Sequence, residues 1–317
     1  MTRLLIGIPT FRRPVLLRRL LGSLARQAGL SAIDVDILVA DNDFDGREGV
    51  QAVEGLVADF PLPLRAKAIA GIGISHVRNA LLDAARQGGF DYLAMLDDDE
   101  WAEPGWLGAL MERARRDVAD VVAGPVRYAM PADTPQQVRE SGIFWNPDRS
   151  SGPVPIVTGT GNVLLSCAAL ERAGWPQFDA GFGLTGGGDH EYFTRLSGMG
   201  FRFSWCEEAI AHEDVPAERA TAKWVLRRAY RYGNGAARIA VRHHGGWAVA
   251  RLAGTALLKL AASPVYAPLL LLPANRLRTQ VKLARALGNI GGLVGLNYHE
   301  YARRHAVPAD ETPVHAS

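Results

Sequence analysis

The sequence is poor in cysteine. Its 317 residues include two, Cys167 and Cys206, and both stand in apolar surroundings without the spacing of a metal site. The cysteine usage therefore fits a reduced, cytosolic setting.

Several short motifs of large enzyme classes are also absent. The chain has no Walker sequence, and Gly71-x-Gly73 lacks the third glycine of a dinucleotide-binding fingerprint, which disfavours a Rossmann dehydrogenase. A G-x-S-x-G elbow is missing, so Ser-His-Asp chemistry has no support. Met1-Thr-Arg runs directly into an apolar stretch, and we therefore expect no signal peptide.

Acidic residues are nearly absent from the C-terminal third. Between Arg219 and Arg304 there are 15 basic residues and one acid, Glu300, whereas residues 1–218 carry 20 basic and 30 acidic ones. The net charge of +2 hides this polarity, which predicts a basic segment facing an anionic surface, either nucleic acid or membrane. No nucleic-acid motif accompanies it, while apolar runs such as 269–272 favour a membrane surface.

Apolar runs of strand length alternate with helical patterns over the first 126 residues. This alternation predicts an α/β fold with a mostly parallel central sheet and right-handed crossovers. The hydrophobic content of 48% is enough for one large α/β domain with an appendage. The strands are expected at 4–8, 35–40, 64–69, 92–96 and 120–126, and the helices at 14–24, 48–58, 75–87 (with Ser75 as N-cap) and 104–116.

The pattern changes after residue 127. Five prolines between Tyr128 and Pro155 predict an irregular region over the sheet, and residues 156–165 are strand-like around a glycine turn. Gly181–Gly188 contains five glycines, typical of a mobile or tightly turned loop. A helix is expected to start at Asp189 and a strand at 201–205. We expect one domain at 1–218, which changes in character after residue 127, and a helical region at 219–317.

The strand at 92–96 ends in four consecutive acids, Asp97, Asp98, Asp99 and Glu100. In an open α/β sheet, the carboxyl end of a strand faces the ligand crevice. Adjacent carboxylates raise one another's pKa unless a cation compensates, and Mg²⁺ or Mn²⁺ is often shared between a carboxylate and substrate phosphates. The simpler interpretation is a solvated acidic loop before the helix near Pro104.

Other polar groups also follow the expected strands, and each of them alone is explained by a cap, a turn or a salt bridge. Together they match the needs of a nucleoside-diphosphate ligand. Asp41 offers hydrogen-bond partners to the nucleotide base, and Arg78 offers positive charge to the phosphates. Asp99 suits a metal ion that neutralises the diphosphate as it leaves. Asp189, at a helix start, suits a general base for the acceptor.

The order of motifs resembles an inverting family 2 glycosyltransferase of GT-A fold. The motifs are P-T-F-R-R-P, V-A-D-N, G-I-S-x-x-R-N-A, L-D-D-D-E, G-T-G-N and G-G-G-D-H-E-Y-F-x-R-L, spread over about residues 4–232. Within that family, A-D-N-D, I-S-x-x-R-N and the pattern around Pro216, Arg219, Arg227 and Arg228 are similar to the succinoglycan glucosyltransferases of exopolysaccharide assembly.

The resemblance implies a GT-A-type three-layer catalytic domain at 1–218, in which 1–127 is the donor side that binds the nucleotide sugar and 128–218 is the acceptor side. It also implies a role for each matching position. Asp189 matches the catalytic base, but Gly188 replaces the first acid of the usual Glu-Asp pair, so Glu191 stays an alternative. Asp99 would bind the metal, with His212 as a further ligand unless its neighbour Glu213 has the functional role. The residues expected at the nucleotide sugar are Pro9, Thr10, Arg12, Asp41, Asn42, Arg78, Asn79, Asp97 and Asp98.

The implied reaction is the transfer of a hexosyl group from a nucleoside-diphosphate sugar, with a UDP-sugar favoured and Mg²⁺ or Mn²⁺ as cofactor. The implied acceptor is a glycan linked to a lipid such as a polyprenyl diphosphate, at the cytoplasmic face of the inner membrane, and no nucleic acid takes part. Two alternatives stay open, a metal-dependent sugar nucleotidyltransferase and a non-catalytic nucleotide-sugar-binding module. The first would need a glycine- and lysine-rich phosphate loop, which residues 9–14 do not provide.

The C-terminal region is predicted to be helical and membrane-associated. Residues 224–242 form a basic helical pattern, and residues 247–272 are apolar but interrupted by Lys259, Pro264 and Pro268. These interruptions disfavour a spanning helix and favour a re-entrant or surface-lying helical hairpin with its basic residues at the lipid headgroups. The alternative is a buried helical pair packed on the catalytic domain.

Overall fold

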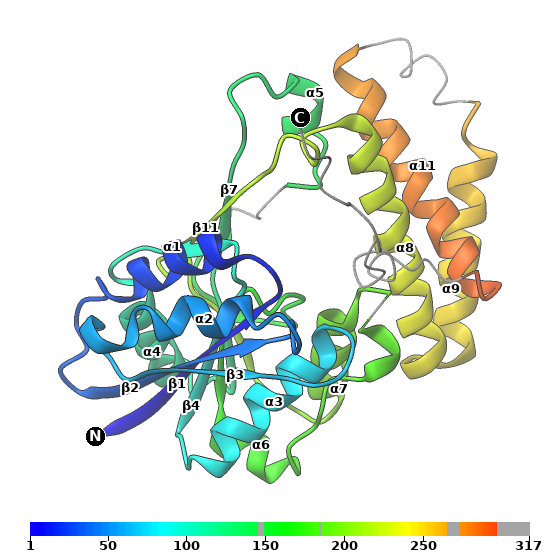
Figure 1. The fold of residues 1–317 in the computed structure, drawn as a ribbon. Coiled ribbons are helices and arrows are strands. Elements are labelled where there is room, and N and C mark those ends of the chain that lie inside the picture. Colours follow the sequence, from blue (N-terminus) through cyan, green and yellow to red (C-terminus); the bar gives the residue numbers. More distant parts are fainter. Residues whose placement is uncertain (145–148, 184, 265–272, 297–317) are drawn as a thin grey trace, which may run out of the picture.

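A mixed sheet of eight strands forms the centre of an α/β body in the computed structural model, which describes residues 1–144, 149–183, 185–264 and 273–296 (Figure 1). The order of the strands is β3-β2-β1-β4-β9-β6-β10-β8. Their bounds are β1 Thr2–Thr10, β2 Ile33–Asp41, β3 Leu64–Ala68, β4 Tyr92–Leu96, β6 Val121–Ala123, β8 Gly152–Val154, β9 Asn162–Ser166 and β10 Phe203–Trp205.

The first four strands of this order are parallel, as predicted, and they determine where the site lies. Thr10 at the end of β1 pairs with Asp41 at the end of β2, and β4 runs parallel to β1 on its other side. The carboxyl ends of these strands therefore share one edge of the sheet. β9 lies between β4 and β6 and is antiparallel to both, which makes the sheet mixed.

Helices cover both faces of the sheet and give the expected three layers (Figure 1). Residues of α1, α2 and α4 pack on one face with Leu4 and Ile6 of β1, and residues of α3, α6 and α7 pack on the other with Leu5. Apolar side chains at 3–4 spacing give α1 and α4 their buried sides. The bounds are α1 Pro14–Leu24, α2 Glu48–Glu54, α3 Ile74–Gln87, α4 Trp106–Arg116, α5 Gln136–Arg139, α6 Cys167–Arg172 and α7 Gly188–Gly198, with short 3₁₀ turns η1 Val57–Asp59 and η2 Ala180–Phe182.

A second, three-stranded sheet was not predicted. It has the order β5-β11-β7, with β5 Glu100–Ala102, β7 Val126–Ala129 and β11 Ala211–Asp214. The strand expected at 120–126 divides between the two sheets, because the chain leaves the large sheet after Ala123 and enters the small one at Val126. The small sheet brings β11 beside the acidic end of β4.

Three other predictions need correction. The helix expected at 48–58 ends at Glu54 and continues as η1. Ser75 is not the cap of α3, since Gly73 has that position and the Ser75 hydroxyl donates to the Asp179 carbonyl at 3.0 Å. The irregular region at 128–155 contains α5 and β8 in its described part.

In the described part of the chain, three long helices follow the α/β body, namely α8 Ala222–His243, α9 Gly245–Ala261 and α11 Pro273–Leu293 (Figure 1). α8 and α11 approach to backbone contact, because a Cβ on Gly288 would lie 2.0 Å from the Tyr230 carbonyl oxygen. Of the hairpin expected at 247–272, α9 covers the first part, and residues 265–272 lie outside the described residues. Among the described helices, none has the length and apolar content needed to cross a membrane.

Candidate active site

The acidic run lies at the shared edge of the strands, and its second member holds that edge together. Asp98 is buried and accepts hydrogen bonds from the Thr10 hydroxyl at 2.8 Å and from Arg13 Nη1 at 2.9 Å. The Phe11 amide donates to the same carboxylate at 3.4 Å. Asp98, which was predicted at the nucleotide sugar, thus connects the end of β1 to the end of β4. Its partner Arg13 was not among the predicted site residues.

Asp99 faces a group of charged residues from three segments. Its carboxylate accepts a hydrogen bond from Arg13 at 2.8 Å and lies 3.8 Å from Arg219 Nη1. Arg219 also contacts Glu213 of β11, at 3.4 Å. Burial and the nearby Asp99 and Asp97 carboxylates raise the pKa of Glu213 to about 8, against the opposite effect of Arg219.

His212 is turned away from this group. Alternate side chains of a strand point to opposite sides, so His212 and its neighbour Glu213 face apart. The imidazole stacks on Trp101, with ring centroids 5.2 Å apart, and its Nε2 lies 3.0 Å from a Glu103 oxygen. His212 was predicted as a further metal ligand, with Glu213 as the alternative functional residue. The structure places Glu213 beside Asp99 and separates His212 from it.

Glu100 stabilises the turn that the acidic run makes after β4. Its buried carboxylate accepts a hydrogen bond from the Asp97 amide at 3.0 Å. A Cβ on Gly161 would lie 2.3 Å from a Glu100 oxygen, so the glycine of the G-T-G-N motif makes room for this carboxylate. Burial, followed by the charges of Asp97 and Glu213, raises the pKa of Glu100 well above its usual value. No role had been predicted for Glu100.

Asp97 and Asp189 meet through Arg78 of α3, whose side chain is buried. The guanidinium donates to Asp189 Oδ1 at 2.5 Å and to Asp97 Oδ1 at 3.3 Å. The second oxygen of Asp189 accepts a hydrogen bond from the Thr160 hydroxyl at 3.1 Å. Burial raises the pKa of Asp97 to about 6, Arg78 opposes this rise, and the charges of Asp99 and Asp189 add to it. Two acids from separate sequence motifs therefore form one site.

Asp189 is in the first turn of α7, where the helix dipole favours a negative charge. Glu191, the alternative base, lies elsewhere. It is 1% exposed, accepts hydrogen bonds from Arg195 at 2.7 and 3.2 Å, and has His243 Nε2 of α8 at 2.9 Å. The structure thus brings Asp189 to the acidic cluster and uses Glu191 to join α7 to α8.

Two residues expected at the nucleotide sugar, Arg12 and Asp41, lie at the ends of β1 and β2. Asp41 is fully buried, and its carboxylate accepts hydrogen bonds from the amides of Asp43, Gly49 and Val50 at 2.9, 2.8 and 3.1 Å. It therefore holds the start of α2. Arg12 has a positive φ of 54° and donates to Asp43 at 3.0 Å. Asp43, which the sequence prediction did not include, is the acid that Arg12 reaches.

Two asparagines and a proline complete this set. The Asn42 side chain bridges to the glycine turn, donating to the Gly71 carbonyl at 2.7 Å and accepting from the Gly73 amide at 3.3 Å. Asn79 makes a pair of hydrogen bonds with the backbone of Phe178, at 3.0 and 2.7 Å. Pro9 is buried in β1 opposite Ala40. Asn42 and Asn79 thus fix the two segments that border Arg78.

Basic residues of α8 hold the glycine-rich loop that precedes Asp189. Arg238 donates to the Gly181 carbonyl at 3.1 Å and to the Thr185 hydroxyl, and its guanidinium lies 4.2 Å from the centre of the Phe182 ring. Arg242 lies 2.5 Å from Asp179. This part of the basic helix therefore contacts the protein itself, in addition to any outside surface.

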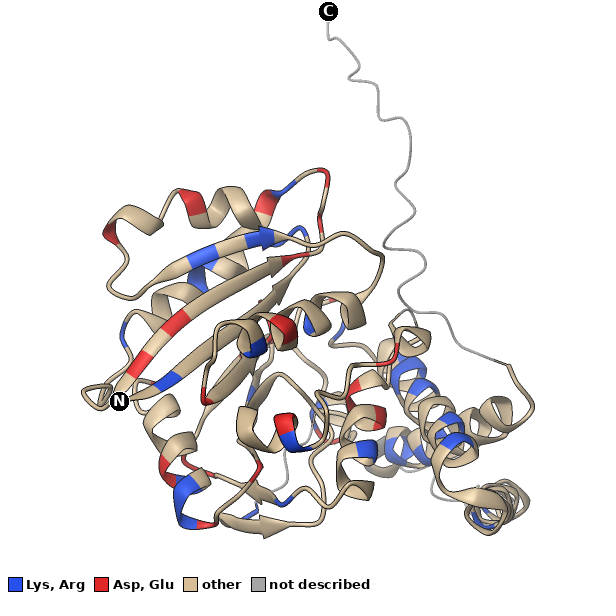
Figure 2. Cartoon of the chain, turned by 90° about the horizontal axis from the view of Figure 1, so that it is seen from below, with Lys and Arg blue, Asp and Glu red and all other residues tan. Residues whose placement is uncertain are grey.

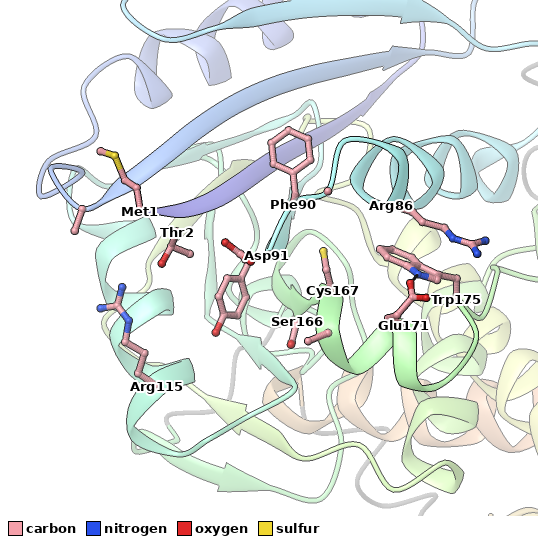
Figure 3. A pocket seen from close by; sticks show the side chains of 14 residues that line it. Met1, Thr2, Arg86, Phe90, Asp91, Arg115, Ser166, Cys167, Glu171 and Trp175 are labelled. Atoms are coloured by element: carbon pink, nitrogen blue, oxygen red, sulfur yellow. Dashed lines mark hydrogen bonds between the residues drawn. The ribbon is translucent and has the colours of Figure 1, made fainter.

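Hollows lie at two opposite edges of the described sheet. One, of about 470 Å³, adjoins the acidic cluster and is lined by Asp99, Arg13, Arg219 and Trp224, among others. The other, of about 720 Å³, lies at the opposite edge of the sheet, around Met1, Asp91 and Trp175 (Figure 3). The larger hollow is remote from every predicted site residue. Cys167 lines it, and both cysteines are buried and free, as expected.

Comparison with known proteins gives matching sequences and folds. Residues 5–172 match the model of the glycosyl transferase family 2. The chain is 34% identical over 316 residues to the succinoglycan biosynthesis protein ExoM of Rhizobium meliloti strain 1021, covering 96% of this chain and 97% of that one. It is 28% identical over 249 residues to a chondroitin synthase of Escherichia coli, covering 67% of this chain and 34% of the relative.

Solved structures share the fold at lower identity. The mannosyltransferase PcManGT of Pyrobaculum calidifontis, in complex with GDP-Man and Mn²⁺, has a TM-score of 0.62 and 20% identity, covering 92% of this chain and 87% of that one. TarS residues 1–349 of S. aureus have a TM-score of 0.53 and 15% identity, covering 93% and 92%. These likenesses show a glycosyltransferase fold of the GT-A type for the α/β body.

Proposed function

Because this chain belongs to glycosyltransferase family 2, we propose that it transfers a hexosyl group, with inversion, from a nucleoside-diphosphate sugar to a lipid-linked glycan during exopolysaccharide assembly. One observation carries the proposal, namely that Arg78 brings Asp97 of the acidic strand end and Asp189 of α7 to the same place. A donor held at the strand ends and an acceptor deprotonated at α7 would meet there.

The proposed reaction is a single displacement. Asp189 removes the proton from an acceptor hydroxyl, the oxygen forms a bond to the anomeric carbon, and the bond from that carbon to the diphosphate oxygen breaks. Thr160 and Arg78 donate to the two oxygens of Asp189 and fix the carboxylate in one orientation. Arg78 also supplies positive charge beside Asp97, at the side where the diphosphate would lie.

We propose that Mg²⁺ or Mn²⁺ assists this reaction. The chemistry of the donor set fits, because Asp97, Asp99 and Glu213 crowd their charges and the pKa values of Asp97 and Glu213 are raised. When bound, the ion would neutralise the diphosphate as it leaves. No group of three metal-binding side chains surrounds one point in the described residues. Asp99 and Glu213 would hold the ion together with substrate phosphates, as is common for Mg²⁺.

The donor class and the location are part of the same proposal. A UDP-sugar is favoured as donor, and the TarS structure has also been solved with UDP-GlcNAc. The basic C-terminal helices support an association with the cytoplasmic face of the inner membrane, where a lipid-linked acceptor would be presented (Figure 2). A sugar nucleotidyltransferase lacks support, since the family match covers the donor side of the chain.

The test is a donor screen with the purified full chain, Mn²⁺ and a lipid-linked acceptor, following both diphosphate release and the glycosylated product. Asp189→Asn is expected to lower the transfer rate at least about a thousandfold while donor binding stays close to that of the wild type. Asp59→Asn, an exposed carboxylate in η1, is the matched control and should be unchanged. Full transfer by Asp189→Asn would remove Asp189 from the base role, and donor binding without any transfer by the wild type would favour a binding module.

A further inference from the structure

The outer side of α9 is apolar and open. Trp247 is 76% exposed, Leu257 58% and Leu258 69%, and Ala256 is the buried residue of this helix. Residues 247, 250, 251, 254, 257, 258 and 261 are all exposed and follow one another at three- and four-residue steps, so they form a single face. A helix on the surface of a soluble domain normally has the reverse arrangement, with its polar side outward.

The charges around this face are of one sign. Arg251 lies on the face itself, with its guanidinium 5.2 Å from the centre of the Trp247 ring, and Lys259 is exposed next to Leu258. The sequence has no acid between Arg219 and Tyr298. Accordingly, α8, α9 and α11 show blue bands and no red ones (Figure 2).

Three occupants suit an exposed apolar face, namely a partner protein, a second copy of this chain and a lipid surface. A second copy would bring Arg251 and Lys259 near their own equivalents, and these like charges would repel. An anionic lipid surface provides the opposite charge for the basic residues and an apolar layer for the leucines. A Trp beside an Arg also suits the headgroup level, since both have an apolar body and a polar end.

We propose that the outer face of α9 is a docking surface for an anionic phospholipid bilayer. The helix lies along the bilayer, Leu257 and Leu258 enter the acyl boundary, and Arg251 and Lys259 contact headgroup phosphates. This inference adds detail to the proposed function. It rests on that function only for the reason why the chain would be located at a membrane. It names the contact through which the chain would reach a lipid-linked acceptor.

The test is cosedimentation of the full chain with vesicles of phosphatidylcholine, with and without phosphatidylglycerol. Binding is expected only with the anionic lipid, and it should weaken as salt is raised. Leu258→Glu should lower the partition coefficient at least about tenfold, because it places a charge where an apolar side chain is buried. Val57→Glu, on the exposed side of η1, is the matched control and should bind as the wild type does.

A second readout uses lipids that carry a fluorescence quencher in the upper acyl chain. Vesicles with the quencher should reduce the emission of the wild type more than that of Trp247→Phe. Equal quenching of the two proteins, or unchanged binding by Leu258→Glu, would overturn the proposal. A wild-type dimer in the absence of lipid that Leu258→Glu converts to a monomer would assign the face to self-association.

Transfer to a water-soluble acceptor separates this proposal from the proposed function. Leu258→Glu should transfer to such an acceptor at the wild-type rate, and a loss there would indicate damage to the fold. If the wild type transfers to no acceptor, vesicle binding still tests the docking surface by itself.

Discussion

Arg78 donates a hydrogen bond to Asp189 at 2.5 Å, although the two residues are 111 positions apart in the sequence. The same guanidinium reaches Asp97 at 3.3 Å. A lysine at this position keeps the charge but has a single nitrogen, so it cannot donate in two fixed directions. The bridge between Asp97 and Asp189, the proposed base, thus depends on the two-pronged shape of the arginine guanidinium.

Arg78→Lys is therefore expected to lower kcat about a hundredfold, because Asp189, the proposed base, loses its fixed position. Arg86→Lys, on an exposed position of the same helix, is the matched control. Steady-state kinetics at several acceptor concentrations would measure both. A change confined to the donor KM, with kcat intact, would limit Arg78 to donor binding.

Glu213→Gln should weaken activation by Mn²⁺, since it removes a carboxylate from the group around Asp99. The apparent affinity for Mn²⁺ is expected to fall about ten- to a hundredfold, as for other groups around protein-bound metals. His212→Gln should leave it nearly unchanged, because that imidazole faces Glu103. A Mn²⁺ titration of both variants decides between the two neighbours, and a larger effect of His212→Gln would restore His212 as the ligand.

Arg238→Ala should loosen the glycine-rich loop before α7, because it removes the hydrogen bonds of Arg238 to Gly181 and Thr185. The expected results are faster hydrogen exchange in this loop and in the first turn of α7, a lower kcat and a nearly constant donor KM. Arg227→Ala, on an exposed position of α8, should change none of these. If exchange in the loop stayed slow while kcat fell, Arg238 would act by another route.

Asp120 makes stability depend on pH far from the site. Burial acts to raise its pKa, but hydrogen bonds from the Arg202 side chain and amide outweigh it, so the pKa of Asp120 is lowered from 3.8. A carboxylate with a lowered pKa stabilises the fold above its unfolded pKa, and this contribution disappears as the pH falls through the folded value.

Asp120→Asn should therefore lower the free energy of unfolding by about 1 to 2 kcal/mol at pH 7, and the difference from the wild type should shrink below about pH 4. Urea unfolding at several pH values gives both quantities. A difference in unfolding free energy that stays constant down to pH 2 would mean that the substitution acts through packing and not through the loss of the Asp120 charge.

The long apolar strands and the acids after them could be predicted from the sequence, because buried parallel strands are continuous runs such as 35–40 and 92–96. The second, three-stranded sheet could not be predicted from the sequence. Its strands have three or four residues, and β11 reads Ala-His-Glu-Asp, which has no apolar pattern. Nothing in the sequence pattern therefore predicts that β11 lies beside the acidic end of β4.

Within the site, the residue types were easier to predict than their tasks. Asp41 and Asp98 were expected at the ligand, but their carboxylates are bound to backbone amides and to Arg13, contacts that no local pattern encodes. Glu213 could have been preferred to His212 only after the register Glu213–Glu100 was known, since that register decides which side chain faces the cluster.

The backbone contact of α8 with α11 at Gly288 gives the C-terminal helices a rigid form. One residue, His244, separates α8 from α9, and His243 just before it contacts Glu191 of the helix that carries Asp189. With α9 resting on a bilayer, Asp189, the proposed base, would stand at a fixed height above the lipid. The enzyme would then select its acceptor by length, because only a glycan of matching length would bring its terminal hydroxyl to that height.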